Sequence, residues 1–202
     1  MTQSMASDET RKLPDWSAAR EPHYRGVPTS ALPPVARNPL HVVLDSLRSA
    51  FNVGSIFRTA DAAAVECIHL CGHTAHPPSK KLEKTALGAL DYVPWTHHPD
   101  ALTAIRALQR KGIPCVAGEV VENAVFHTSF DWPRPVAVVF GNEVVGIAPE
   151  TLRQCDGIVC IPMQGFKNTI NVATAFGIIV YEILRHWGSL DRGTRISSPT
   201  RP

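Results

Sequence analysis

The sequence predicts an α/β fold in which helices flank a mostly parallel sheet. Between residues 40 and 187, short apolar runs alternate with segments whose apolar residues have helical spacing. The composition is that of a globular domain, with 44% hydrophobic and 19% charged residues. A chain of 202 residues has room for one such domain with a sizeable core.

The sequence of the first half of the domain predicts three strands and one helix. The run LHVVL predicts a buried strand at Leu40–Leu44, and a helical pattern follows at Val53–Ala64. Cys67–Cys71 is the second predicted strand and Tyr92–Trp95 a third. Because strands and helices alternate, we expect the strands to pair in parallel.

The next helix has recognisable signals at both ends. Asp100 is an expected N-cap and Gly112 an expected C-cap. Between them, Leu102, Ile105 and Leu108 follow helical spacing on one face. The sequence therefore predicts an amphipathic helix packed on the sheet.

The remaining elements are three strands and a long apolar helix. The strands are predicted at Ile113–Ala117, Val136–Phe140 and Ile158–Ile161. Thr169–Trp187 predicts a helix that is apolar on nearly every side until Glu182. We expect such a helix to be buried, either in the core or against a second subunit.

The two ends of the chain lack this pattern. Residues 1–39 and 188–202 are rich in Pro, Ser, Thr and charge, which predicts flexible arms on either side of a domain at 40–187. The chain begins without an apolar signal core, and its five cysteines have no regular spacing. The longest apolar run, Val172–Tyr181, is too short to cross a bilayer. These features favour a cytoplasmic protein with reduced thiols and no membrane partner.

Phosphate-binding motifs are absent from the sequence. The first predicted strand is followed by Asp45–Arg48 rather than by a glycine-rich turn, and G-x-G occurs nowhere. No Walker loop, H-E-x-x-H or C-x-x-C is present either. A site that cradles nucleotide phosphates is therefore not expected.

A first segment with chemical potential follows the first strand and runs from Asn52 to Ala60. Asn52 can cap a helix, and Gly54 allows another backbone to approach closely. Arg58 is expected near the carboxyl edge of the sheet, where open α/β sheets bind ligands. Alternatively, Arg58 lies on a solvated helix face and pairs with Asp61.

A second segment, Phe140–Gly146, directly follows a predicted strand. Its terminal glycines permit a tight loop with exposed amides, and Glu143 lies between them. Loops at strand carboxyl ends often carry function. A plain turn with a solvated Glu143 is the alternative.

The third segment, Ile161–Val172, links the last strand to the apolar helix. Thr169 or Asn168 can cap that helix. Asn171 then falls inside the first turn, where asparagine is unfavourable by propensity. Either Asn171 has a functional role, or it satisfies free amides at the helix terminus.

With these three segments in order, the chain resembles the SpoU (TrmH-type) methyltransferases of the SPOUT superfamily over roughly residues 38–187. The motifs are N-x-G-x-x-x-R-x-A, F-G-N-E-x-x-G and I-P-M-x-G-x-x-x-[ST]-x-N-V, at the three segments above. Two departures are conservative: Thr169 stands where the family usually has serine, and Ile170 where it usually has leucine.

The resemblance implies a fold and an activity. The fold is a parallel α/β domain with a deep C-terminal trefoil knot, which sequence physics alone would not propose. The activity is methyl transfer from S-adenosyl-L-methionine to a ribose 2′-hydroxyl of RNA, in a homodimer whose active site lies near the subunit interface. RNA rather than DNA follows from the 2′-hydroxyl. We expect tRNA as the substrate, with rRNA as the rival.

The resemblance also implies roles for ten residues. The expected cofactor-binding residues, which act mainly through main-chain groups, are Gly141, Ile161, Ile170, Met163 and Gly118. The expected catalytic residues are Arg58, Asn52, Glu143, Thr169 and Asn171.

Arg58 is the residue that the family assigns to deprotonation of the 2′-hydroxyl. A guanidinium is a poor base near neutrality, so steering the RNA phosphate and stabilising oxyanion charge is the alternative role. Asn52 would orient Arg58 or the ribose, and Glu143 would hold them in place. Thr169 and Asn171 would position the substrate.

Several basic residues are candidate phosphate contacts. They are Arg48, Lys80, Lys81, Lys84 and Lys167 in the domain, and Arg11, Lys12, Arg192 and Arg195 in the arms.

Three alternatives to this interpretation remain. Cys67, His69, Cys71 and His73 alternate on one strand, with His76 nearby, and could bind zinc. Same-face neighbours on a strand lie about 7 Å apart, too far for all four to share one ion, so we predict no metal site. The other two are a non-catalytic RNA-binding protein and a methyltransferase that modifies a base nitrogen.

Overall fold

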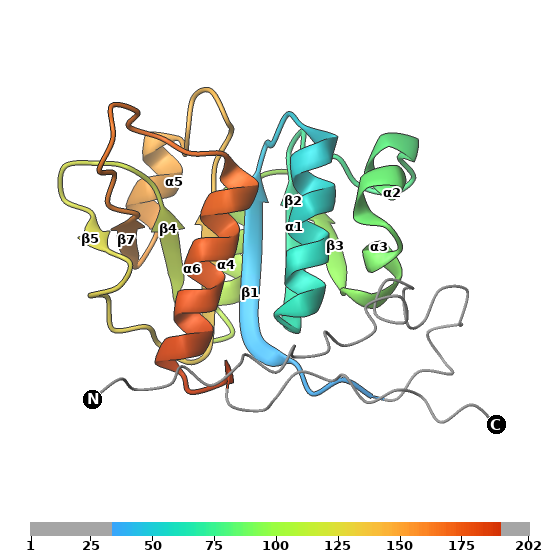
Figure 1. The fold of residues 1–202 in the computed structure, drawn as a ribbon, viewed down its shortest axis with the longest axis horizontal. Helices are drawn as coiled ribbons and strands as arrows, with labels where there is room; N and C mark the ends of the chain where they lie inside the picture. Colours follow the sequence, from blue (N-terminus) through green and yellow to red (C-terminus); the bar gives the residue numbers. More distant parts are fainter. Residues whose placement is uncertain (1–33, 191–202) are drawn as a thin grey trace, which may run out of the picture. The chain divides into compact units, whose positions relative to one another are not determined.

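The computed structural model describes residues 34–190, which form a seven-stranded sheet with helices on both faces (Figure 1). The strand order is β3-β2-β1-β6-β4-β7-β5, and every neighbouring pair is parallel. The predicted α/β class with a mostly parallel sheet is confirmed.

The bounds of the elements follow the chain order. The strands are β1 (Asn38–Asp45), β2 (Val65–Cys71), β3 (Trp95–His98), β4 (Cys115–Gly118), β5 (Val125–Phe126), β6 (Val136–Phe140) and β7 (Gly157–Cys160). The helices are α1 (Ala50–Ala62), α2 (Lys80–Ala86), α3 (Ala89–Tyr92), α4 (Ala101–Gln109), α5 (Pro149–Gln154) and α6 (Val172–His186). The predicted third strand, Tyr92–Trp95, is displaced toward the C-terminus, because residues up to Tyr92 complete α3.

Two apolar layers hold the helices to the sheet. Leu40, Val42 and Leu44 of β1 pack with α1 and α6 on one face, whereas Val43 joins the cluster beneath α4 on the other. Figure 1 shows α1 and α6 in front of the sheet. Central parallel strands are buried on both faces, which explains why β1 reads as a continuous apolar run.

The last helix is only partly buried in a single chain. Phe176, Ile179 and Val180 of α6 are in the core, but the side chains of Ile178 and Tyr181 are 38% and 40% exposed. A single chain therefore buries one face of α6 in the core, and burial of the other face against a second subunit stays a prediction. The reason is geometric, since a helix lying on a sheet contacts it along one face.

Three of the predicted helix caps differ from the structure. α4 ends at Arg110 as its C-cap, and Gly112, the predicted C-cap, lies two residues farther on. Ser49, not Asn52, caps α1 and accepts a hydrogen bond from the Asn52 amide at 3.3 Å. Asn171 itself caps α6, accepting from the amides of Ala173 and Thr174, so neither Thr169 nor Asn168 does. Asn171 therefore precedes the first turn instead of lying inside it.

The parallel strands bring four loops to one edge of the sheet. These loops follow the carboxyl ends of β1, β4, β6 and β7. In open parallel sheets this edge is where ligands bind. The three segments singled out in the sequence all begin at it.

The predicted arms lie mostly outside the described residues, as do Arg11, Lys12, Arg192 and Arg195. At the boundary, β1 begins at Asn38, two residues before the expected domain start. Within residues 34–190, no helix is both long enough and apolar enough to cross a membrane.

Candidate active site

A cavity of about 1120 Å³ lies at the carboxyl edge of the sheet, among the loops after β1, β4, β6 and β7. It is lined by nine of the ten residues that the resemblance singles out. Gly118 ends β4, and the other eight come from the three motifs: Asn52, Gly141, Glu143, Ile161, Met163, Thr169, Ile170 and Asn171. The fold thus gathers residues separated by up to 119 positions in sequence.

Glu143 is held at the N-terminus of α1. Its carboxylate accepts hydrogen bonds from the amides of Arg48 at 2.8 Å and Ser49 at 3.1 Å, and from Asn52 Nδ2 at 2.8 Å. Partial burial alone would raise the pKa of Glu143, but these hydrogen bonds outweigh burial and lower it. The group is therefore a carboxylate at neutral pH, in a position where the helix dipole favours negative charge.

One hydrogen-bonded chain joins the three motifs. Asn52 donates to Glu143 through Nδ2 and accepts from Asn171 Nδ2 through Oδ1 at 3.0 Å. Asn171 uses its own Oδ1 to cap α6. These hydrogen bonds fix the orientation of both amide side chains. They also hold the start of α1, the loop after β6 and the start of α6 in one arrangement.

The loop after β6 is closed on itself. Asn142 and Gly146 exchange backbone hydrogen bonds of 3.2 and 2.9 Å. Asn142 also accepts from the Val144 amide at 2.9 Å and donates to the Ser46 carbonyl at 2.7 Å. This places the Gly141 backbone against the far end of the same loop, where a Cβ would lie 2.5 Å from the Ile147 nitrogen.

Glu119 is a residue of this site that the sequence analysis missed. It directly follows β4, lines the cavity, and accepts from the amides of Ile147 at 2.9 Å and Val120 at 2.8 Å. A carboxylate two residues after the predicted strand Ile113–Ala117 was a signal that could have identified it. Glu119 therefore holds the loop after β6 on the side of β4, whereas the Ser46 carbonyl holds it on the side of β1.

The cavity suits a ligand without phosphates, as S-adenosylmethionine is. Arg48 and Lys167 are its basic lining residues, and Glu119 and Glu143 are its acidic ones. The wall at Gly118 is closely packed, since a Cβ there would lie 3.2 Å from both Ile179 Cδ1 and Phe140 Cε1, and these side chains would have to shift. Apolar walls with bare backbone fit the adenosine, and flanking carboxylates fit the cationic sulfonium.

Comparison with known proteins decides the family. The SpoU rRNA Methylase family matches residues 39–181. This chain belongs to the SpoU family. The tRNA (guanosine(18)-2′-O)-methyltransferase of Thermus thermophilus is 33% identical over 146 residues, which cover 72% of this chain and 74% of that enzyme. The 23S rRNA (guanosine-2′-O-)-methyltransferase RlmB of Photobacterium profundum is 32% identical over 152 residues, 74% of this chain and 61% of that enzyme.

Solved structures of SpoU proteins agree with this membership. The TrmH/SpoU tRNA modifying enzyme of A. aeolicus aligns with a TM-score of 0.69 at 27% identity, covering 76% of this chain and 77% of that one. The SpoU methyltransferase AviRb of Streptomyces viridochromogenes, in complex with the cofactor AdoMet, aligns with a TM-score of 0.70 at 28% identity, covering 77% and 63%.

Arg58 is the one SpoU motif residue of the ten that stands apart from the cavity. It is exposed on α1, six residues after Asn52, or about 9 Å along the helix axis. It lines a second, shallower hollow of about 420 Å³ whose other residues are Ser55, Thr59, Ala62 and Tyr181. Within the described residues no salt bridge joins Arg58 to Asp61.

The four residues weighed as a zinc set are not brought together. Cys67 and His69 share a face of β2, but Cys71 is buried farther along it and His73 is exposed beyond its end. The neighbour of Cys67 and His69 is instead His41 of β1. Burial lowers the pKa of His69 to about 3 and also lowers that of His41, so both imidazoles are neutral at pH 7.

Replacing Glu143 with glutamine tests the motif network through its pH dependence. The variant loses one acceptor at the N-terminus of α1, so we expect a lower melting temperature than wild type at pH 7 and reduced methyl transfer. Because the folded-state pKa of Glu143 is lowered, the carboxylate stabilises the fold above its unfolded pKa, and this stabilisation is lost as pH falls through the folded value.

The measurement is thermal unfolding of both proteins between pH 7 and pH 3. The difference in melting temperature should shrink below about pH 4.5, where the carboxylate of the unfolded chain begins to protonate, and should vanish once the folded-state carboxylate is protonated as well. A difference that stays constant down to pH 3 would contradict the charge-based role of Glu143.

Proposed function

We propose that this protein transfers the methyl group of S-adenosylmethionine to a ribose 2′-hydroxyl of RNA, with tRNA as the substrate, in the cytoplasm. The observation that carries the proposal is the chain of hydrogen bonds Glu143–Asn52–Asn171, which unites the three SpoU motifs at the rim of one cavity. The relatives named for guanosine 2′-O-methylation of tRNA and rRNA support it.

In this proposal the cavity positions the cofactor, which supplies an electrophilic methyl group. Backbone groups at Gly118, Gly141 and Ile161 would hold the adenosine, with Met163 and Ile170 closing the wall. Attack on a methyl group requires the oxygen in line with the bond that breaks, so the protein must fix both partners and exclude water. Thr169 and Asn171, exposed at the rim, would position the ribose.

Arg58 would stabilise the oxygen as its proton leaves. Its exposed position beside Tyr181, away from the cavity of its own chain, suggests that it serves the cavity of a second copy. We therefore propose a homodimer that pairs the exposed parts of α1 and α6, where Ile178 and Tyr181 present apolar surface. In such a dimer each active site contains residues from both chains.

The trefoil knot implied by the SpoU resemblance belongs to the same proposal. After β6 the chain passes β4 to reach β7, and the long loop from Ile161 to Asn171 then leads to α6. Threading of this segment would fix the loops that line the cofactor cavity.

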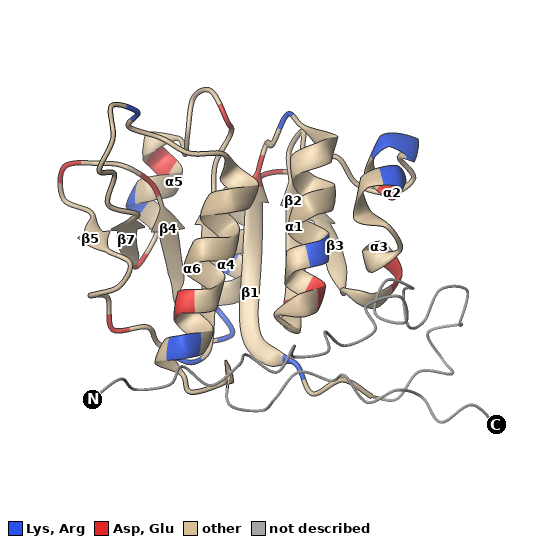
Figure 2. Cartoon of the chain, in the orientation of Figure 1, with Lys and Arg blue, Asp and Glu red and all other residues tan. Residues whose placement is uncertain are grey.

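RNA would bind along the carboxyl edge. Arg48 and Lys167 line the cavity, while Lys80, Lys81 and Lys84 belong to α2. Figure 2 shows the basic residues of α2 at the same edge as the loop between β1 and α1. Positive charge at the mouth of the cavity would attract the phosphate backbone. Because the net charge of the whole chain is only +2, the attraction for RNA would come from these clustered residues rather than from the overall charge.

Methyl transfer to separate RNA pools tests the proposal. Radiolabelled S-adenosylmethionine is incubated with the protein and either unmodified tRNA or unmodified rRNA. Label in tRNA, recovered as an alkali-stable dinucleotide, is the expected result, because a 2′-O-methyl group blocks alkaline cleavage at its linkage.

The other outcomes separate the alternatives. Alkali-stable label in rRNA would support 2′-O-methylation and would assign rRNA, instead of tRNA, as the substrate. Label released in mononucleotides would indicate base methylation. Absence of label from both pools together with absence of cofactor binding would favour a non-catalytic RNA-binding protein.

A further inference from the structure

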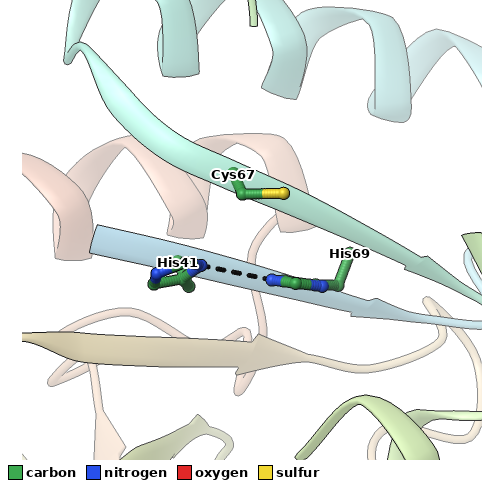
Figure 3. Close-up of side chains that lie close together, drawn as sticks. All are labelled: His41, Cys67 and His69. Atoms are coloured by element: carbon green, nitrogen blue, oxygen red, sulfur yellow. Dashed lines mark hydrogen bonds between the residues drawn. The ribbon is translucent and has the colours of Figure 1, made fainter. Parts of the chain in front are cut away.

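A cluster of metal-ligand side chains lies in the sheet, apart from the carboxyl edge. His41 lies in β1, and Cys67 and His69 lie in β2, where the strand register pairs His41 with Cys67 and Val43 with His69. Residues of alternate positions share a face, so all three project on the face covered by α4. Figure 3 shows His41 and His69 pointing toward each other with Cys67 beside them.

The spacing of the ligand atoms matches a metal centre. His41 Nδ1 and His69 Nε2 are 3.2 Å apart, and each lies within 4.8 Å of Cys67 Sγ. Two nitrogens bound to one zinc ion at about 2.0–2.1 Å with tetrahedral angles lie about 3.3–3.4 Å apart. The two nitrogens therefore already have almost the spacing that zinc requires. Binding needs a modest rotation of each ring, so that both lone pairs point to the ion, and an approach of the thiol by about 1 Å.

A further histidine orients the central ligand. His69 Nδ1 lies 2.9 Å from His98 Nε2 of β3. When Nδ1 donates its proton to His98, the lone pair of His69 Nε2 points toward His41. Metal-bound histidines commonly use their second ring nitrogen in this way, which fixes the tautomer and the ring plane.

We propose that His41, Cys67 and His69 bind one zinc ion. Thiolate and imidazole donors together suit zinc better than magnesium or calcium, which prefer oxygen. The ion would link β1 to β2 in the sheet. Three protein ligands leave a fourth position for water.

The site is separate from methyl transfer. His41 lies four residues before the carboxyl end of β1, and none of the three ligands lines the cofactor cavity. Zinc binding to the folded state would raise the melting temperature in proportion to the logarithm of zinc concentration. This inference does not depend on the proposed function.

The experiment is metal titration of the full chain after treatment with a chelator. Calorimetry with zinc chloride should give one equivalent per chain. Cobalt(II) as the probe should give the visible absorption of a tetrahedral ion and a near-ultraviolet thiolate charge-transfer band. Cys67→Ser should remove that band, and His41→Gln should weaken zinc binding by more than the roughly 10–100-fold typical of a lost outer-shell partner.

His98→Ala is expected to weaken zinc binding by about 10–100-fold while the stoichiometry stays at one. Matched controls carry the same changes elsewhere: Cys155→Ser and His73→Gln should bind zinc like wild type. Circular dichroism establishes that each variant is folded.

Two results would overturn the zinc site. One is a failure of the unsubstituted protein, which does not depend on the folding of any variant: either it binds no stoichiometric zinc, or its cobalt spectrum lacks the thiolate band. The other is zinc affinity that is unchanged in folded Cys67→Ser and His41→Gln proteins, which would assign binding to surface histidines.

Discussion

Adding a single methyl group at Gly141 is expected to weaken S-adenosylmethionine binding and to reduce methyl transfer by about 100-fold, because a displacement of about 1 Å at a site that positions reacting groups can cost that much in rate. A Cβ at this position would collide with the Gly146 carbonyl group and lie 2.5 Å from the Ile147 nitrogen. All of these are backbone atoms, which cannot rotate away as a side chain can. The loop must open, and it forms one wall of the cofactor cavity.

The collision also affects the fold. The loop is closed by the backbone pairing of Asn142 with Gly146 and fastened by Glu119 through the Ile147 amide. Forcing it apart is a case of overpacking, for which we expect a loss of about 1–3 kcal/mol in the free energy of unfolding. A folded Gly141→Ala protein with a lowered melting temperature and weak cofactor binding is the expected combination.

Calorimetric titration with S-adenosylmethionine measures the effect, and Gly165→Ala is the matched control. Gly165 lies in the loop after β7, where an added Cβ would meet no atom within 4 Å. This control should retain cofactor affinity close to that of wild type. Equal affinities for wild type and Gly141→Ala would refute the role of this loop as a wall of the cofactor site.

Buried strands were the most predictable part of the fold. β6 was predicted with its observed bounds, Val136–Phe140, because all five residues are buried and apolar. Four short elements were missed, since two to seven residues are too few to show a clear period: α2, α3, α5 and β5. Their presence depends on the neighbours that they contact, which a local pattern does not contain.

The helix ends show a different limit of sequence reasoning. Ser49 and Asn52 are both good N-cap residues, and propensity alone does not choose between them. In the structure Ser49 takes the cap, which frees Asn52 to connect Glu143 with Asn171. That choice is made by residues more than 90 positions away, so only the assembled fold reveals it.

The site was predictable where a motif existed and unpredictable where contacts cross between strands. Eight expected residues of the three motifs line one cavity, because each motif lies at the carboxyl end of a strand on the same edge of the sheet. Glu119 lies outside all three motifs. His41 was missed as a neighbour of Cys67 and His69, because it comes from the adjacent strand at about 5 Å spacing, and a pattern along one strand does not contain such a contact.

Replacing Arg58 with alanine is expected to reduce the turnover number by about 10²–10³-fold, the range seen when one donor that stabilises a developing oxyanion is removed. Affinity for S-adenosylmethionine should stay the same, because Arg58 does not line the cofactor cavity of its own chain. Single-turnover methyl transfer to RNA and calorimetric cofactor titration measure the two quantities separately. Unchanged turnover would remove Arg58 from the mechanism.

Mixing the Arg58→Ala and Gly141→Ala proteins, at a cofactor concentration too low to occupy the Gly141→Ala cavity, then shows which cavity Arg58 serves. In a dimer of one Arg58→Ala chain and one Gly141→Ala chain, the first has an intact cavity and the second has an intact arginine. If Arg58 acts in its partner's site, reassorted dimers should recover about one quarter of wild-type activity, since about half of them are mixed and each mixed dimer has one complete site. If Arg58 acts in its own chain, neither cavity is complete and the mixture stays inactive. The exposed position of Arg58 beside Tyr181 leads us to expect recovery.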